Sequence, residues 1–222
     1  MDAVLFDMDG VLVDSVSYKY EHWKRVLWDD IGLTAVDVDA LVGLNSHDKY
    51  EYLVDQHGLQ TDRDRFLRLL DGDVDRIYEE QVQLLEGVES SFEWLAGESI
   101  PVGLVSASSR DNVKTVVDRF EIGDSLDTVV SADDIDDDSK PDPAIYRHAA
   151  ATLDAEPGDC LAIEDSPHGV TAATGAGAYC IGYAPSDRPD RDIDHADEVV
   201  TSPERLQERI RAIVVGQTGG VP

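Results

Sequence analysis

The sequence predicts an α/β fold, a doubly wound parallel sheet with a Rossmann-like core and an inserted α-helical cap domain. Two patterns predict it. Short apolar runs alternate with stretches of helical periodicity along most of the chain, as in sheets whose parallel strands are joined by helices. Residues 15–86 instead show helical periodicity broken by glycines, with no convincing strand. We therefore expect a core formed by residues 1–14 and 87–222, and a helical cap formed by residues 15–86.

Five short segments with apolar centres are the expected strands. Such runs, bounded by turn residues, are typical of strands buried on both faces of a parallel sheet. The expected strands are Ala3–Phe6, Val102–Val105, Asp127–Ser131, Cys160–Ile163 and Ala178–Ile181.

Helical periodicity fills the intervals between these strands. In the cap the expected helices run from Ser15 to Gly32, Val36 to Leu44, Ser46 to His57 and Asp62 to Leu85. In the core they run from Ser91 to Ala96, Ser109 to Phe120, Asp142 to Leu153, Val170 to Gly175 and Ser202 to Val214.

The composition is strongly acidic. Among 222 residues, 47 acids stand against 18 bases, which gives a formal net charge of −29. This charge would repel phosphate backbones and anionic lipids, so it argues against nucleic acids and membranes as partners. We interpret the charge as an adaptation to a salty environment. In molar salt the repulsion between the acidic side chains is screened beyond a distance of about 3 Å, so such a surface is tolerated there. A dedicated acidic interaction surface is the alternative.

The two cysteines, Cys160 and Cys180, lie in predicted inner strands, and we expect buried free thiols. The N-terminus shows no secretory signal, and no apolar run approaches the roughly 20 residues of a membrane-spanning helix. We expect a soluble cytoplasmic protein that is a monomer or a weak homo-oligomer.

Two acids follow the first expected strand. Asp7 comes directly after the apolar run and Asp9 two residues later, and Gly10 permits backbone angles that a side chain would forbid. Ligands of α/β sheets bind at the carboxyl ends of the strands. Because two close carboxylates repel each other unless a cation or a proton is present, this pair predicts a metal site.

Four motifs in chain order resemble those of the haloacid dehalogenase superfamily, in its phosphatase and phosphomutase branch. The motifs are Asp7 and Asp9 in FDMDGVLVDS, Ser106 in LVSASS, Lys140 in SKPDP, and Glu164 with Asp165 in AIEDSPHGV. The resemblance covers nearly the whole chain. It implies a phosphoric monoester hydrolase that acts on a small phosphorylated metabolite, such as a sugar phosphate or a phosphoglycolate-like compound.

The resemblance also implies roles for these residues. Asp7 would be the nucleophile that forms an aspartyl phosphate, and Asp9 the general acid and base. Mg²⁺ would be held by Asp7, the backbone carbonyl of Asp9, Asp165, and Glu164 directly or through water. Ser106, the following Ala107 and Lys140 would bind the phosphate.

The cap is expected to select the substrate, around Lys19 and the loop 43–48 with His47. In the β-phosphoglucomutase branch a histidine stands where this chain has Lys19, and an arginine where it has His47. These departures favour a phosphatase, and a phosphomutase remains the alternative. Arg110 is either a substrate contact or part of a surface salt bridge. A non-catalytic phospho-acceptor module would explain Asp7 but not the second acid.

Overall fold

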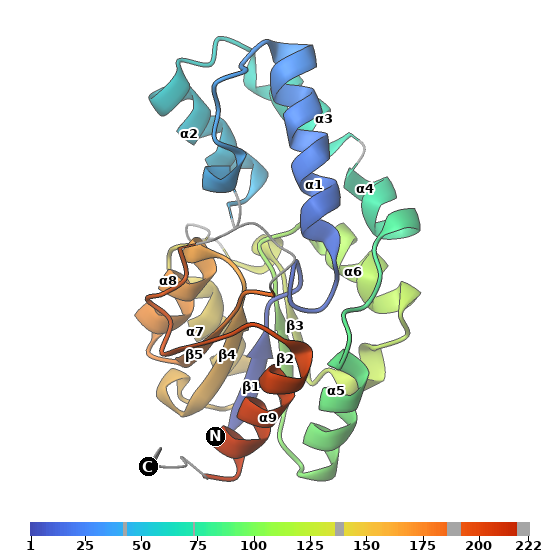
Figure 1. The fold of residues 1–222 in the computed structure, drawn as a ribbon, viewed down its shortest axis with the longest axis vertical. Coiled ribbons are helices and arrows are strands. Elements are labelled where there is room, and N and C mark those ends of the chain that lie inside the picture. The colour runs from blue at the N-terminus through green and yellow to red at the C-terminus, as the bar shows by residue number, and fades with distance from the viewer. Residues whose placement is uncertain (42–43, 73, 136–139, 186–191, 217–222) are drawn as a thin grey trace.

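The sheet has six parallel strands in the order β3-β2-β1-β4-β5-β6 (Figure 1). The structure is a computed structural model, and it describes residues 1–41, 44–72, 74–135, 140–185 and 192–216. The strands are β1 (Ala3–Phe6), β2 (Val102–Val105), β3 (Thr128–Val130), β4 (Cys160–Glu164), β5 (Tyr179–Tyr183) and β6 (Glu198–Val200). The doubly wound parallel sheet is therefore confirmed, with all five expected strands in it.

β1 lies in the middle of the sheet, and this position decides where the strand-end residues meet. Val4 pairs with Val102 of β2 on one side and with Leu161 of β4 on the other. All four residues of β1 are buried, which explains their continuous apolar run. The chain order reverses at β1, so its carboxyl end opens at the point where such sheets bind ligands.

The edge strand β6 is absent from the sequence-based prediction. It has only three residues, of which Val200 alone is buried, and Val199 is exposed. A strand this short, with one buried side chain, carries too little periodicity to stand out.

Helices cover both faces of the sheet (Figure 1). One face, which includes Val4 and Phe6, packs against α5 (Val88–Gly97), α6 (Arg110–Arg119) and α9 (Pro203–Val214). The other face, which includes Ala3 and Leu5, packs against α7 (Ala144–Thr152) and α8 (Pro167–Ala176). Three short 3₁₀ turns complete the core: η4 (Gly123–Ser125), η5 (Ala132–Asp134) and η6 (Pro157–Asp159). Both cysteines are buried and free, as predicted.

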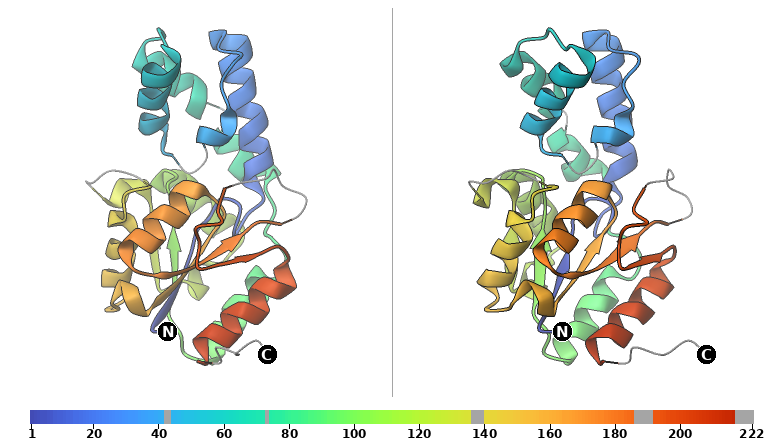
Figure 2. Two further views of the ribbon diagram at one scale, coloured as in Figure 1. Left: turned by 60° about the vertical axis from the view of Figure 1, so that its left-hand side comes forward. Right: turned by 90° about the vertical axis from the view of Figure 1, so that its left-hand side faces the viewer.

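A helical segment inserted between β1 and α5 stands beyond the carboxyl ends of the strands (Figures 1 and 2). Its elements, called the helical insert below, are α1 (Ser15–Lys24), η1 (Arg25–Ile31), η2 (Val38–Leu41), α2 (Ser46–His57), α3 (Arg63–Asp71), α4 (Val74–Arg76) and η3 (Ile77–Gln81). The insert has an apolar cluster of its own, which includes Trp23, Leu53 and Phe66. The predicted domain boundaries at residues 15 and 86 stay a prediction.

Two expected helices of the insert were too long. The stretch from Val36 to Leu44 forms only the 3₁₀ turn η2 among its described residues. The stretch from Asp62 to Leu85 is divided: α3 stops at Gly72, and η3 ends where Val82 adopts an extended conformation. The chain then runs alongside residues 13–14, with Leu84 bridged to Val13, and this pairing overrides the helical periodicity.

None of the helices in the described part of the chain combines the length and the apolar character that a membrane crossing requires.

Candidate active site

The loop after β1 brings Asp7 and Asp9 to one cavity. The backbone N–H of Asp7 donates to the carbonyl of Ile163 at 3.0 Å, which extends the pairing with β4 and fixes Asp7 beside the end of that strand. Gly10 has a φ of 93°, in the left-handed region that favours glycine, and its N–H donates to the carbonyl of Val13 at 2.8 Å. In this turn both acids line the same cavity.

Lys140 is buried between two of the acids. Its Nζ lies 2.7 Å from Oδ1 of Asp7 and 2.6 Å from Oε1 of Glu164, and it also donates to the carbonyl of Val105 at 3.2 Å. These contacts use all three N–H groups of the ammonium. The two carboxylates hold the pKa of Lys140 above its ordinary value against the effect of burial, so the cation persists.

Asp7, Glu164 and Asp165 form a buried cluster in which one carboxylate oxygen of each lies within 4.8 Å of the others. Burial raises the pKa of Asp7 well above its ordinary value, and the negative charge of Glu164 raises it further. A set of carboxylate oxygens with this spacing suits a hard divalent cation such as Mg²⁺, which would also offset their mutual repulsion.

Glu164 is held by donors on both of its oxygens. Oε1 accepts from Lys140 and from the hydroxyl of Tyr146 at 2.7 Å, and Oε2 accepts from the Asp165 N–H and the Ser166 hydroxyl. Gly169 in α8 leaves the space that this carboxylate fills, because a Cβ there would lie 2.0 Å from it. The helix that follows β4 is thus built to accept a buried acid.

Asp9 accepts hydrogen bonds from four side chains. Oδ1 accepts from Ser15 at 2.5 Å and from the hydroxyl of Tyr78 at 2.7 Å, whereas Oδ2 lies 2.8 Å from both Lys19 Nζ and Ser108 Oγ. Burial opposes ionisation, but the charge of Lys19 and these hydrogen bonds lower the pKa of Asp9 to about 2. In this arrangement Asp9 is a carboxylate, the form that accepts a proton.

The cavity onto which both acids open has a volume of about 350 Å³. It is lined from the strand ends and from the helical insert: the core supplies Asp7, Asp9, Lys140 and Asp165 among others, and the insert supplies Lys19, Trp23, His47 and Lys49 among others. A ligand in this cavity would therefore touch both parts of the molecule.

Comparison with known proteins agrees with this geometry. The family of haloacid dehalogenase-like hydrolases matches residues 4–183. The chain belongs to this family. It is 30% identical to β-phosphoglucomutase of Bacillus subtilis over 190 residues, which are 82% of this chain and 83% of that protein. It is 32% identical to hexitol phosphatase B of Escherichia coli over 190 residues, which are 78% of this chain and 79% of that protein.

A solved haloacid dehalogenase family hydrolase from Deinococcus radiodurans, with bound phosphate and sodium, has the same fold. It is 28% identical, with a TM-score of 0.71, over 98% of this chain and 96% of that one. The family match and the relatives named as phosphatases confirm the predicted enzyme class, a phosphoric monoester hydrolase.

The predicted phosphate-binding segment of this hydrolase is split between the cavity and the interior. Ala107 lines the cavity, whereas Ser106 is fully buried and its hydroxyl accepts the N–H of Ser108 at 3.1 Å. Ser106 therefore stabilises the turn after β2 in this structure. The phosphate-binding role of both residues stays a prediction.

The three predicted substrate residues lie in different places. Lys19 lines the cavity but is paired with Asp9. His47 also lines it, is exposed, and its ring Nδ1 accepts from Arg63 at 3.0 Å. Arg110 does not line the cavity; it is exposed and paired with Asp134 at 2.5 Å. Of its two predicted roles, substrate contact and surface salt bridge, this structure contains the salt bridge.

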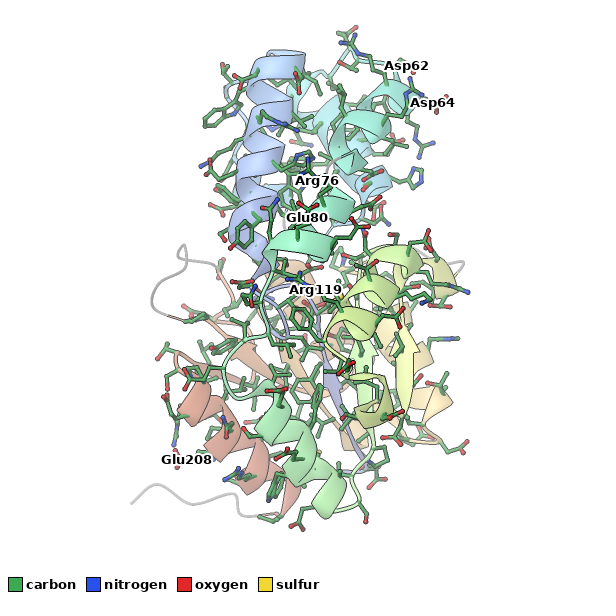
Figure 3. All side chains as sticks on the ribbon, turned by 90° about the vertical axis from the view of Figure 1, so that its right-hand side faces the viewer. Asp62, Asp64, Arg76, Glu80, Arg119 and Glu208 are labelled. Atoms are coloured by element: carbon green, nitrogen blue, oxygen red, sulfur yellow. The ribbon has the colours of Figure 1, made fainter. Side chains whose placement is uncertain are left out.

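Sequence reasoning missed Tyr78, which lies at the junction of insert and core. Its hydroxyl binds Asp9 and Ser108, and its backbone carbonyl accepts from Arg119 of α6 at 2.6 Å. Figure 3 shows Arg119 on the side of the core that faces the helical insert. Burial, then the charge of Asp9, raise the pKa of Tyr78, so the hydroxyl remains a donor. No local pattern in the sequence marks a tyrosine 69 residues away from the acid that it contacts.

Proposed function

We propose that this hydrolase is a Mg²⁺-dependent phosphatase that cleaves a small phosphate monoester through an aspartyl phosphate on Asp7. The observation that carries the proposal is the surroundings of Asp7. It directly follows the central strand β1, lines the cavity, is paired with the Lys140 ammonium, and belongs to the acidic cluster with Glu164 and Asp165. An oxygen nucleophile beside a fixed cation and a cation site suits attack on a phosphate dianion.

The reaction takes two balanced steps. In the first, Asp9 must already have taken up a proton from solvent; a carboxylate oxygen of Asp7 bonds to phosphorus, the bond to the leaving oxygen breaks, and the protonated Asp9 donates its proton to that oxygen. In the second, water bonds to phosphorus, Asp9 takes a proton from it, and the bond from phosphorus to Asp7 breaks. The products are the alcohol and inorganic phosphate, and both acids return to their starting forms.

Asp7, Asp165 and the backbone carbonyl of Asp9 would hold the Mg²⁺. Glu164 already accepts four hydrogen bonds, which favours its contact with the ion through water. When bound, the ion offsets the negative charge of the phosphate and of the carboxylates.

The substrate that we propose is a small metabolite, a sugar phosphate or a phosphoglycolate-like compound. A cavity of about 350 Å³ lies in the range of small-molecule sites. The formal net charge of −29 disfavours nucleic acid as a substrate.

Phosphomutase activity is the second candidate, and the 30% identity to the β-phosphoglucomutase of B. subtilis favours it. The two activities differ in whether inorganic phosphate is released. Interconversion of glucose 1-phosphate and glucose 6-phosphate without net phosphate release would replace the phosphatase assignment with the mutase.

The test is phosphate release from p-nitrophenyl phosphate with Mg²⁺ in molar KCl, compared with a sample that contains EDTA. Asp7→Asn should abolish turnover, and Asp29→Asn is the matched control because Asp29 is an exposed acid of the insert. Undiminished turnover by Asp7→Asn would contradict the mechanism, and full activity in EDTA would contradict the metal dependence.

A further inference from the structure

Lys49 is a buried lysine that the proposed reaction does not use. It belongs to α2 of the helical insert, is 6% exposed, and lines the same cavity as Asp7. Its ammonium donates to the carbonyl of Leu44 and lies 4.6 Å from the centroid of the Trp23 ring. A carbonyl and an aromatic ring attract a cation, but neither neutralises it.

Lys49 differs from the two other lysines that line the cavity. Lys140 is paired with two acids of the core, and Lys19 is paired with Asp9. No carboxylate in the described ranges of the chain forms an ion pair with Lys49. In a protein with a formal net charge of −29, a buried cation that has no carboxylate partner within the described ranges is unexpected.

Two of the acids near Lys49 accept hydrogen bonds from other side chains. Asp9 accepts four hydrogen bonds, and Asp71 accepts from the hydroxyl of Ser46 at 2.7 Å. Burial and, after it, the positive charge of Lys19 lower the pKa of Lys49 to about 7. Each of the neighbouring acids raises this pKa by less than Lys19 lowers it. The Lys49 ammonium therefore lines the cavity without an ion-pair partner among the described residues, and an anion placed beside it would be stabilised.

Lys49 and Asp7 line the cavity from different parts of the molecule: Lys49 belongs to α2 of the helical insert, whereas Asp7 follows β1 in the core. Lys19, Asp9 and two acids of the insert are the charged groups that act most strongly on Lys49. The groups that act most strongly on Asp7 belong to the core, and Asp9 is the one that both sets share. An anion at Lys49 would therefore belong to the end of the substrate remote from the reacting phosphate.

We infer that Lys49 binds a second anionic group of the substrate, a carboxylate or a further phosphate, at the end remote from the scissile phosphate. The inference rests on the proposed function and narrows it to phosphate esters that carry such a group. Lys49 would select between substrates because it is buried. An ester with an anionic remote end would pair with the ammonium, whereas an ester with a neutral end would leave it without a counter-ion.

The experiment uses two pairs of ligands that differ in the remote group. Phosphoglycolate is compared with 2-hydroxyethyl phosphate for the carboxylate, and fructose 1,6-bisphosphate with fructose 6-phosphate for the second phosphate. Turnover is measured with Mg²⁺ as kcat/KM for the wild type, Lys49→Met and Lys24→Met. Lys24 is the control, because it is a more exposed lysine of the insert paired with Glu21.

We expect the wild type to prefer the anionic member of at least one pair by about tenfold or more, the range of a charge-assisted hydrogen bond. Lys49→Met should remove this preference, and Lys24→Met should keep it. The pair that shows the effect identifies the anion as carboxylate or phosphate. A preference that survives in Lys49→Met, or no preference in the wild type for either pair, would overturn the inference.

A binding measurement separates this inference from the proposed function. Calorimetric titration of the same four compounds into Asp7→Asn and into Asp7→Asn with Lys49→Met requires no turnover. Preferential binding that depends on Lys49 without any hydrolysis by the wild type would retain the inference and reject the phosphatase. Lys49→Arg, which keeps the charge, should retain the preference, and its loss in a folded Lys49→Arg protein would count against a charge-based role.

Discussion

Replacing Lys49 by methionine should stabilise the folded protein at neutral pH. The change keeps an apolar stem in the buried position and removes an ammonium that has no carboxylate partner among the described residues. Residues that bind a ligand often destabilise the ligand-free protein. The destabilisation by Lys49 can be measured without knowledge of the substrate.

The magnitude follows from the pKa of Lys49, which falls from 10.5 to about 7 on folding. Each pKa unit corresponds to about 1.4 kcal/mol, so the charged form is disfavoured by roughly 5 kcal/mol at most, and by roughly 4 kcal/mol at pH 7. Loss of the hydrogen bond to the Leu44 carbonyl costs about 1 kcal/mol in the variant. The expected net gain of Lys49→Met at pH 7 is therefore about 2 to 3 kcal/mol.

The pH dependence has a definite sign. Between pH 7 and 10.5 the unfolded chain binds the Lys49 proton and the folded protein releases it, so the wild type gains stability as the pH rises. Below pH 7 both states are protonated and the cost is fully present. The advantage of Lys49→Met should shrink by roughly 3 kcal/mol between pH 7 and 9.5.

Urea unfolding followed by circular dichroism in molar KCl measures this difference, with Lys24→Met as the control for titration elsewhere. The free energies of unfolding of variant and wild type are compared at several pH values. A difference that does not change with pH, or a Lys49→Met protein that is less stable than the wild type at pH 7, would refute the reasoning.

Three further outcomes are expected. Asp9→Asn should lower alkyl phosphate hydrolysis about 100-fold or more, and aryl phosphate hydrolysis less, because a good leaving group needs no proton; equal losses for both esters would contradict the acid role. Gly169→Ala should lower the melting temperature, because the added Cβ would lie 2.0 Å from the Glu164 carboxylate. Gly175→Ala in the same helix is the control and should leave the melting temperature unchanged, because the nearest contact of its Cβ is at 3.7 Å. The melting temperature should rise between dilute buffer and molar KCl, since salt screens the net charge of −29, and a constant value would refute salt adaptation.

The core could be predicted because its signals are local. The run Ala3–Phe6 is apolar throughout since β1 is covered on both faces, and it stops at Asp7, where the strand meets the cavity. Asp165 likewise follows β4, but its place in the site was implied by the resemblance of the motif AIEDSPHGV. The parallel arrangement then places these strand ends together, so the acidic cluster follows from the order of the elements.

The charge balance of the site could not be predicted, because it depends on contacts between distant residues. Lys140 lies 133 residues from Asp7 in the chain, and the sequence alone does not distinguish binding of a phosphate from the pairing of two acids. Lys49 carried no local signal either: the sequence drew attention to Lys19 and His47, whereas burial singles out the lysine two residues beyond His47. Burial of a polar side chain is a property of the packed insert.

The central claim, that Asp7 is the nucleophile, is tested most directly by identifying the phosphorylated residue. Asp9→Asn protein is treated with acetyl phosphate and Mg²⁺, because attack by Asp7 survives in this variant whereas activation of water does not. Reduction with borohydride converts a phosphoaspartate to homoserine, and mass spectrometry of the N-terminal peptide locates the change. The mechanism predicts homoserine at position 7 and none in Asp7→Asn with Asp9→Asn; an unmodified Asp7, or an adduct at Asp165 instead, would contradict it.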